Sequence, residues 1–325
     1  MRRKLLIALG AGALSAPFAS LAQQQTKVAR IGFLGAETPS DTATRVEAMR
    51  SGLRDLGYVE VRNIVIEFRW AEGKYDRLRD LAAELVGLKV DVIVTDGAKA
   101  VLAAKQATTT VPIVIGNVSD PVALGLVSSL ARPGGNITGS ASFGPETVAK
   151  RLELLRQFMP HLRRVGALLN PGNPSSAPKL EAMQTAAKSL KVELYPAEVR
   201  ASSEFDGVFA SLAAKRVEAV IVDTDTLFVA NGNAIAVIAT KTRLPSAGSA
   251  EYAEAGGMLG YGPNLLELFR RAAYFIDRIL KGARPGDLPI ERASRFELVI
   301  NVKTAKALGV TIPKAVLVRA DRLIE

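Results

Sequence analysis

The sequence contains no cysteine and a single histidine among its 325 residues. Without cysteine, neither a disulfide nor a lipid-modified cysteine at an export signal can form. Zinc, iron and copper are normally held by several His or Cys side chains. With His161 as its single histidine, the sequence favours neither such a metal centre nor a Ser-His-Asp triad. We expect no metal and no cofactor.

Long apolar runs and clustered charges are also lacking. Beyond the N-terminal segment, no apolar stretch reaches the roughly 20 residues that a membrane-spanning helix needs. The net charge is +10, but the Lys and Arg residues are scattered along the chain. Nucleic-acid binding typically uses basic runs with interleaved aromatic residues. We therefore expect no nucleic-acid partner. We also expect the protein to be a monomer.

The N-terminus has the pattern of a secretory signal peptide. Three cations at positions 2–4 precede an apolar run over 5–18, and the small residues Ser20 and Ala22 follow. This pattern predicts a signal peptide over 1–22 that is removed by cleavage, and hence export to the periplasm. The arginine pair leaves both the Sec and the twin-arginine route open.

The hydrophobic rhythm predicts two α/β lobes. About 300 residues after the signal exceed the usual size of one core. Short runs rich in Val and Ile alternate with segments of helical period, which is typical of βαβ units around a parallel sheet. The first series of strands is expected at 28–36, 63–71, 90–97, 111–117 and 136–142. The second series is expected at 165–170, 192–199, 218–225, 244–249 and 295–301.

The intervening helices are expected at 41–58, 74–88, 98–107, 145–159, 176–190, 204–215, 227–241 and 264–281. The fold class is thus two doubly wound parallel-sheet lobes joined by a hinge of several chain crossings. Residues 28–140 plus 258–282 are assigned to lobe 1, and residues 143–256 plus 285–325 to lobe 2. The crossings are expected near 139–143, 256–262 and 282–292.

Polar residues follow most of the predicted strands, where an open parallel sheet places its ligand. The candidate site residues in the first half are Gly35, Glu37, Thr38, Asp96, Gly97, Asn117, Ser119, Asp120 and Pro121. Those in the second half are Asn170, Asn173, Ser175, Asp223, Asp225, Ser249 and Glu251, with Tyr261 at a predicted crossing. Each could instead cap a helix. Polar strand ends from two lobes that face one cleft are nevertheless what a clamp requires.

Two acidic positions suggest how a ligand could be held. Asp120-Pro121 predicts a helix start whose positive dipole end faces the cleft and could bind a carboxylate. Asp225 could receive an ammonium group. This pairing fits an amino acid and other zwitterions equally well, and a polar neutral ligand could use the same amides. Asp223 and Asp225 also suggest hydrolase chemistry, but glycosidases use carboxylates that flank the substrate bond, so this local pair is weak evidence.

Four stretches resemble the ABC-transporter substrate-binding proteins of the tryptophan/tyrosine type, which look like type I periplasmic binding proteins. The stretches are SDPVALGLVSSLARPGGNITG, KRLELLRQFMPHLRRVGALLNPGNP, EYAEAGGMLGYGPNLLELFRRAAYFIDRILKGARPGDLPIE and FELVINVKTAKALGVTIP. The resemblance implies two lobes with three crossings, closure on the ligand and delivery to an ABC permease with a cytoplasmic ATPase. The cleft positions that it implies are Asp120, Pro121, Asn170, Asn173, Asp225 and Tyr261.

The function expected from these features is that of a periplasmic solute-binding component of an ABC importer, not of an enzyme. Its partner would be a small organic ligand of amino-acid type, aromatic ones included. The alternative is a ligand-sensing periplasmic subunit for a membrane receptor, because sensing and transport use the same closure. A gene regulator of this fold would need a DNA-binding helix pair before Val28, where the signal stands instead.

Overall fold

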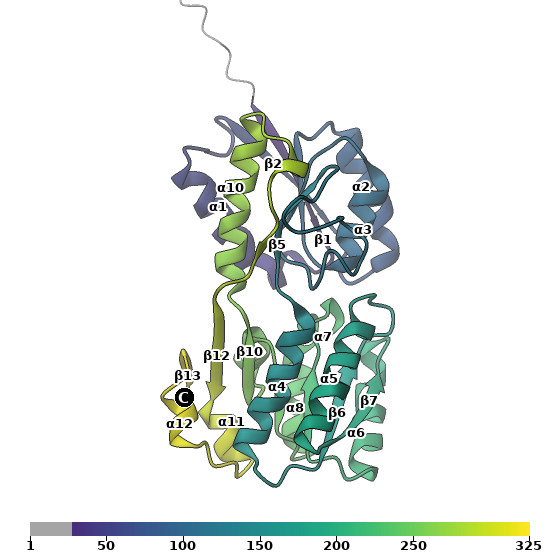
Figure 1. Cartoon of the computed structure of the whole chain (residues 1–325), viewed down its shortest axis with the longest axis vertical. Helices are drawn as coiled ribbons and strands as arrows, with labels where there is room; N and C mark the ends of the chain where they lie inside the picture. The colour runs from purple at the N-terminus through teal and green to yellow at the C-terminus, as the bar shows by residue number, and fades with distance from the viewer. Residues whose placement is uncertain (1–27) are drawn as a thin grey trace, which may run out of the picture.

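The structure is a computed structural model that describes residues 28–325. The expected signal peptide over 1–22 lies outside the described residues. Within them the chain forms two α/β lobes, one above the other in Figure 1, each built around its own sheet. The C-terminus lies on the outer side of the lower lobe. No helix between residues 28 and 325 is both long and apolar enough to cross a membrane.

The first lobe contains a six-stranded sheet in the order β11-β5-β4-β3-β1-β2, with all strands parallel. Its strands are β1 (Ala29–Gly35), β2 (Ile64–Trp70), β3 (Val92–Thr95), β4 (Ile113–Ile115), β5 (Ile137–Ala141) and β11 (Glu291–Arg292). One face is covered by α1 (Pro39–Asp55) and α10 (Leu265–Leu280). The other is covered by α2 (Leu78–Gly87) and α3 (Ala98–Ala107). Two short 3-10 turns, η1 (Tyr75–Arg77) and η3 (Pro285–Asp287), complete the lobe.

The second lobe contains a seven-stranded sheet in the order β13-β12-β10-β9-β8-β6-β7. Its strands are β6 (Arg164–Leu169), β7 (Glu193–Glu198), β8 (Ala219–Val222), β9 (Ser246–Gly248), β10 (Leu259–Pro263), β12 (Phe296–Asn301) and β13 (Arg322–Ile324). Its helices are α4 (Gly144–Phe158), α5 (Ser176–Leu190), α6 (Phe205–Ala214), α7 (Thr226–Ala230), α8 (Gly232–Lys241), α9 (Ala250–Glu254), α11 (Val302–Ala307) and α12 (Lys314–Leu317), with a 3-10 turn η2 (Ser202–Glu204). The pair β10–β12 is antiparallel, because the chain leaves this sheet through β10 and returns through β12.

The central strands of both sheets are buried on their two faces. β3 and β8 each consist of four fully buried residues, which explains why these strands are continuous apolar runs instead of alternating patterns. Helix α10 contributes Phe269 and Phe275 to the core of the first lobe. It packs so closely on α1 that a Cβ at Gly52 would lie 2.6 Å from the carbonyl oxygen of Arg270. The glycine is therefore a packing residue.

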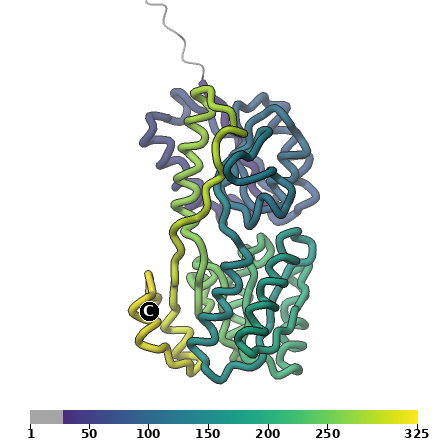
Figure 2. The backbone as a smooth tube through the Cα atoms, viewed as in Figure 1, coloured from purple at the N-terminus to yellow at the C-terminus, as the bar shows by residue number. Residues whose placement is uncertain are grey.

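The chain passes between the lobes three times, and Figure 2 shows the three segments running together through the waist of the molecule. They follow β5 at 142–143, join β10 to α10 at Asn264, and join β11 to β12 at 293–295. The expected boundaries need two corrections. Residues 258–263, assigned to lobe 1, include β10 in the second sheet, and residues 285–292, assigned to lobe 2, include β11 beside β5.

The cause of the first boundary error is the role of the glycines around β10. They suggested a crossing, but they serve packing within the second lobe. A Cβ at Gly260 would lie 2.6 Å from the carbonyl oxygen of Ser249, at the start of α9. Glycine is needed here because the strand and the helix approach closely, not because the chain turns.

Two helix boundaries also differ from expectation. Helix α1 begins at Pro39, and Thr38 is its N-cap in a reciprocal capping box with Asp41. The helix expected over 41–58 therefore begins two residues earlier, and Asp41 is its third residue. The segment predicted as one helix over 227–241 is broken at Asn231, which ends α7 and leads into α8.

The helix expected after Asp120-Pro121 is absent. Asp120 does accept hydrogen bonds from the amides of Val122 and Ala123, both at 3.0 Å. Residues 121–125 form turns only, however, and Gly125 has φ +65°. The left-handed glycine reverses the chain before a helix can propagate. No helix dipole is therefore directed from this position.

Candidate ligand-binding site

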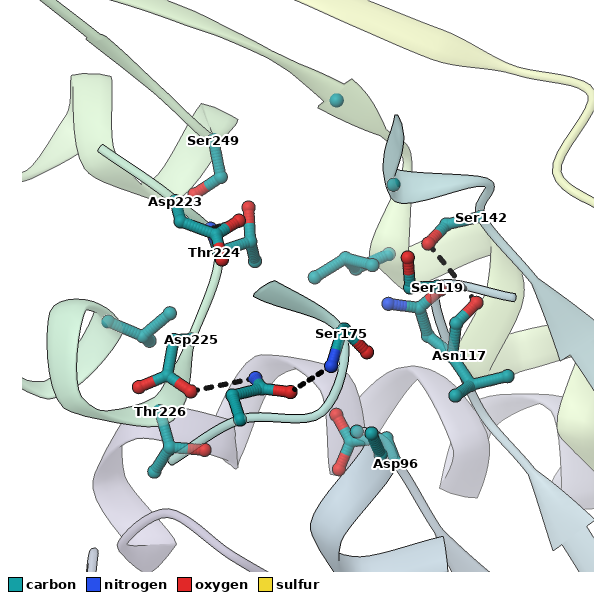
Figure 3. Close-up of a pocket in the computed structure, with 18 of the residues that line it drawn as sticks. Asp96, Asn117, Ser119, Ser142, Ser175, Asp223, Thr224, Asp225, Thr226 and Ser249 are labelled. Carbon is teal, nitrogen blue, oxygen red and sulfur yellow. Dashed lines mark hydrogen bonds between the residues drawn. The ribbon is translucent and has the colours of Figure 1, made fainter. Parts of the chain in front are cut away.

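A cavity lies between the two lobes, at the ends of strands from both sheets. It holds about 1000 Å³ of space, with the solvent of its open mouth included. Figure 3 shows labelled residues of the second lobe, among them Asp223 and Asp225, across the cavity from Asp96 and Asn117 of the first. The predicted residues that line it are Glu37, Asp96, Gly97, Asn117, Ser119, Asn173, Ser175, Asp223, Asp225, Ser249 and Glu251.

The wall from the first lobe is built around Arg45 of α1. Its guanidinium donates to Glu37 Oε2 at 2.7 Å and to Asp96 Oδ2 at 3.0 Å, and all three side chains are nearly buried. One cation thus serves two carboxylates. Burial outweighs Arg45 and raises the pKa of Glu37 to about 8, and burial also raises the pKa of Asp96. The cluster therefore retains a proton at neutral pH, because one guanidinium cannot compensate two buried negative charges.

The same wall includes the start of α3. Its N-cap is Gly97, at φ +73°, and no side chain caps the helix. Lys99, in the first turn, lies with its ammonium nitrogen 5.2 Å from the ring centre of Tyr75. Among residues 28–325 it forms no ion pair. The uncapped amides and the free ammonium make this part of the wall electropositive.

The wall from the second lobe contains a buried ion pair. Lys179 of α5 donates to Asp223 Oδ1 at 2.7 Å, and the two side chains are 5% and 0% exposed. The second carboxylate oxygen, Oδ2, is buried with no hydrogen-bond partner in the described chain. Burial raises the pKa of Asp223, against the effect of Lys179. The pair stabilises the end of β8 instead of presenting a free charge.

Arg151 of α4 lies beside this pair. It donates to the carbonyl oxygens of Tyr261 and Val222 and to the hydroxyl of Thr224, at 2.8, 3.1 and 2.9 Å. All three acceptors are neutral. Burial lowers the pKa of Arg151 to about 10, so the group stays charged at neutral pH. Its hydrogen bonds join α4 to β8 and β10 under the floor of the cavity.

Asp225 connects the two lobes directly. As N-cap of α7 it accepts from the Leu227 amide at 3.0 Å. The amides of Asn170 and Asn173 donate to it at 2.9 and 2.8 Å, and the Tyr75 hydroxyl, from the first lobe, donates at 2.9 Å. Burial and the Asp225 charge raise the pKa of Tyr75, so this hydroxyl remains a donor. We name the Tyr75–Asp225 hydrogen bond the cross-cleft bond.

Six predicted site residues lie outside the lining. They are Gly35, Thr38, Asp120, Pro121, Asn170 and Tyr261. Gly35 lies under the Trp70 ring, where a Cβ would be 2.2 Å from ring carbons. Tyr261 stacks on Phe296 with ring centres 5.8 Å apart, in the second lobe. Asn170 acts one step behind the cavity, by orienting Asp225.

The five charged or aromatic lining residues that were missed come from helices or a short turn instead of strand ends. They are Arg45, Tyr75, Lys99, Arg151 and Lys179. A signal was nevertheless present in the sequence. The three buried cations each occur four residues before an apolar core residue on the same helix, namely Met49, Leu155 and Met183. A cation within the apolar stripe of a helix indicates a buried partner.

A cavity enclosed by two hinged α/β lobes, with polar lining from both, defines a clamp for a small ligand. The chain belongs to the family of ABC transporter substrate binding proteins, whose model matches residues 35–324. Its fold is that of type I periplasmic binding proteins. Distant solute-binding proteins at 13% and 14% identity share that fold, with TM-scores of 0.61 and 0.59.

Several closer relatives have known ligands or conformations. The chain is 30% identical to the tyrosine-binding protein of Clostridioides difficile (strain R20291), over 79% of this chain and 74% of the relative. An ABC domain from Streptococcus pneumoniae, solved in complex with L-Trp, is 26% identical with a TM-score of 0.83, over 90% of this chain and all of that one. CD0873, a substrate-binding protein from Clostridium difficile solved ligand-free and open, is 27% identical with a TM-score of 0.67, over 88% and 97%.

The chain is similar to these two solved relatives to different degrees. At nearly equal identity, the chain superposes better on the L-Trp complex than on the open, ligand-free structure. The cross-cleft bond is consistent with this difference, since the Tyr75 and Asp225 side chains can meet only when the lobes approach. In the described structure the two lobes are thus in direct contact across the cleft.

Proposed function

We propose that this protein is the solute-binding component of an ABC importer, which captures a small zwitterionic ligand of amino-acid type between its lobes and delivers it to a permease without transforming it. The observation that carries the proposal is the cavity in a closed cleft, lined by charged groups of both signs from both lobes. The family supports it. So do the relatives, one named for tyrosine and one solved with L-Trp.

The charges of the lining support a zwitterion. An anionic group of the ligand is favoured at the start of α3, where Lys99 and the uncapped amides lie. A cationic group is favoured on the opposite side, where the second lobe contributes three carboxylates. The apolar part of the lining includes Val118, Val148 and Leu265, which suits the hydrophobic portion of an amino acid. Tyr75 is the one aromatic side chain among the described lining residues.

Closure is the step that links binding to delivery. Gly144 begins α4 at the first crossing, where an added Cβ would lie 2.3 Å from Ser119 Oγ and 2.8 Å from Lys179 Cε. An added side chain at this position would therefore have to displace Ser119 of the first lobe and Lys179 of the second. A ligand that contacts both walls has a higher affinity for the closed form and shifts the population toward it. The permease would then recognise the closed, loaded clamp.

The site of action that we propose is the periplasm, after removal of residues 1–22. Mass spectrometry of the exported protein should give a chain that begins at Gln23. An exported species that retains the segment over 5–18 would contradict this proposal.

Binding is tested first by thermal shift over amino acids, small aromatic acids, sugars and polyamines. A ligand at 100 times its dissociation constant stabilises the folded protein by about 2.7 kcal/mol. Small-angle scattering of the best ligand should show a smaller radius of gyration than the ligand-free protein. Uptake by vesicles that contain the permease and ATPase separates transport from sensing. Stabilisation without compaction, or compaction without uptake, would contradict the clamp or the importer part of the proposal, respectively.

A further inference from the structure

Five carboxylates line the cavity, and they differ in what already occupies them. They are Glu37, Asp96, Asp223, Asp225 and Glu251. Glu37 and Asp96 share the guanidinium of Arg45. Asp223 holds Lys179. A carboxylate whose charge is already compensated by a buried cation gains less from a ligand ammonium than an unpaired carboxylate does. This holds for Asp223 as well, although its Oδ2 has no hydrogen-bond partner in the described chain.

Asp225 is the most occupied of the five. Four donors converge on its two oxygens: the Leu227 amide, the side-chain amides of Asn170 and Asn173, and the Tyr75 hydroxyl. A carboxylate offers about four acceptor sites. In the closed form this residue therefore holds the cleft shut, and a ligand ammonium would have to displace Tyr75 to reach it.

Glu251 is the exception. It lies in the first turn of α9 and is only partly buried, and its side-chain carboxylate has neither a hydrogen bond nor an ion pair to any residue within 28–325. Its negative charge acts on Arg45 of the first lobe and on Arg151 of the second, favouring the charged form of each. Glu251 therefore lies within electrostatic reach of both walls. The guanidinium groups of those arginines are already held by other acceptors.

Resting on the proposed function, we propose that Glu251 is the specificity-determining residue of the cavity, the carboxylate that accepts the ammonium group of the ligand. The ligand class is then an amine that also carries an anionic group, as an α-amino acid does. A charge-assisted bond in a closed, partly desolvated cleft is stronger than one in water. The same acid without its amine would leave Glu251 facing the cavity with an uncompensated charge, so the clamp should reject it.

The test uses matched pairs of ligands on the mature chain. L-leucine, L-tyrosine and L-tryptophan are compared with their des-amino acids, 4-methylpentanoate, 3-(4-hydroxyphenyl)propionate and 3-(indol-3-yl)propionate, by isothermal titration calorimetry. The native protein should bind at least one amino acid tenfold to a hundredfold more tightly than its des-amino partner. Glu251→Gln, which keeps the shape of the side chain, should lower the affinity for that amino acid by a similar factor. The affinity for the des-amino acid should stay the same within about threefold, so that the variant no longer distinguishes the amino acid from its des-amino partner.

The matched control is Glu254→Gln. Glu254 is on the same helix, is exposed, and pairs with Arg322 outside the cavity. This variant should bind all six compounds as the native protein does. Circular dichroism and thermal unfolding of both variants show whether α9 is intact, since a damaged helix would weaken both members of a ligand pair alike.

The outcomes separate this proposal from the proposed function. Glu251→Gln could lower the affinity for an amino acid and for its des-amino partner by the same factor, or lower neither affinity. Either result would show that Glu251 does not recognise the amine. The proposal would then be overturned, while the proposed ligand-binding clamp would stand. Equal affinity of the native protein for both members of a pair has the same consequence. If none of the six compounds binds or compacts the native protein, the amino-acid class fails, and the proposed function is overturned with it.

Discussion

Both walls of the cleft contain a buried ion pair, but the ratio of cations to acids differs between them. In each lobe, a cation from the apolar stripe of a helix meets acidic residues near the end of a strand. In the first lobe one guanidinium, Arg45, serves the two acids Glu37 and Asp96. In the second lobe Lys179 holds one acid, Asp223, with Arg151 close by. The buried cluster of the first wall is thus short of positive charge and the buried pair of the second wall is not, which makes their responses to mutation and pH different.

The largest effect is expected from Arg45→Met. This change removes the guanidinium that two buried acids share, one of which keeps its proton at neutral pH. Breaking a buried ion pair on one side costs about 3–5 kcal/mol. The free energy of unfolding, from urea denaturation at pH 7, should fall toward the upper end of that range. Arg54→Met is the control, because Arg54 and Glu47 form an exposed pair on the same helix, and such changes usually stay within about 0.5 kcal/mol. Equal losses for the two variants would contradict the role assigned to Arg45.

Lys179→Met should have a smaller effect, of about 3 kcal/mol, since it strands only one carboxylate. Asp223 also keeps its bond from the Thr224 amide at 2.7 Å. Adding Asp223→Asn to Lys179→Met removes the uncompensated charge and should recover part of the loss. The same denaturation measurement decides the comparison, and a double variant less stable than the single one would contradict it.

The pH dependence should come mainly from the first wall. The pKa of Glu37 is raised from its ordinary value of 4.5 to about 8 in the folded protein. Between these values the folded state binds more protons than the unfolded state, so the contribution to stability is complete below pH 4.5 and is lost as the pH rises toward 8. One proton corresponds to about 1.4 kcal/mol per pH unit. Glu37→Gln should reduce the change in the free energy of unfolding between pH 5 and pH 8. An unchanged pH dependence would show that Glu37 does not cause it.

The smallest effect is expected from Tyr75→Phe, which removes only the hydroxyl of the cross-cleft bond. Affinity for every ligand should fall by the same factor, on the order of tenfold, because the closed form loses about 1.4 kcal/mol relative to the open form. The ligand-free protein should also show a larger radius of gyration. This uniform loss contrasts with the ligand-selective loss expected from Glu251→Gln. A selective effect of Tyr75→Phe would mean that Tyr75 contacts the ligand.

Most of the fold could be predicted from sequence, because buried strands and amphipathic helices have distinct periods. Helices α3 and α5 begin and end where the pattern placed them. The strand β10 was misassigned, because the glycines that let it approach α9 look the same in sequence as glycines in a turn. Local pattern cannot tell which neighbour a small residue accommodates.

The candidate site could be predicted only in part. Strand-end residues such as Asp96 and Asp223 were found because topology alone places them at the cleft. Arg45 and Lys179 were not, since a cation on a helix becomes a lining residue only through the tertiary packing that buries it. Asp225 illustrates a further limit. As an acidic residue after a strand it was predicted to contact the ligand, but in the structure its oxygens accept four hydrogen bonds from the protein, one of them from a residue 150 positions away. Sequence cannot show such distant donors.

The triple crossing has a consequence for how the chain is made. The core of the first lobe includes Phe269 and Phe275 of α10, and the sheet of the second lobe includes β12 and β13, which end at Ile324. During synthesis from the N-terminus, neither core can close until most of the chain has left the ribosome, because each lobe waits for a segment encoded after the other lobe has begun. The topology itself therefore delays the folding of both lobes until synthesis is nearly complete.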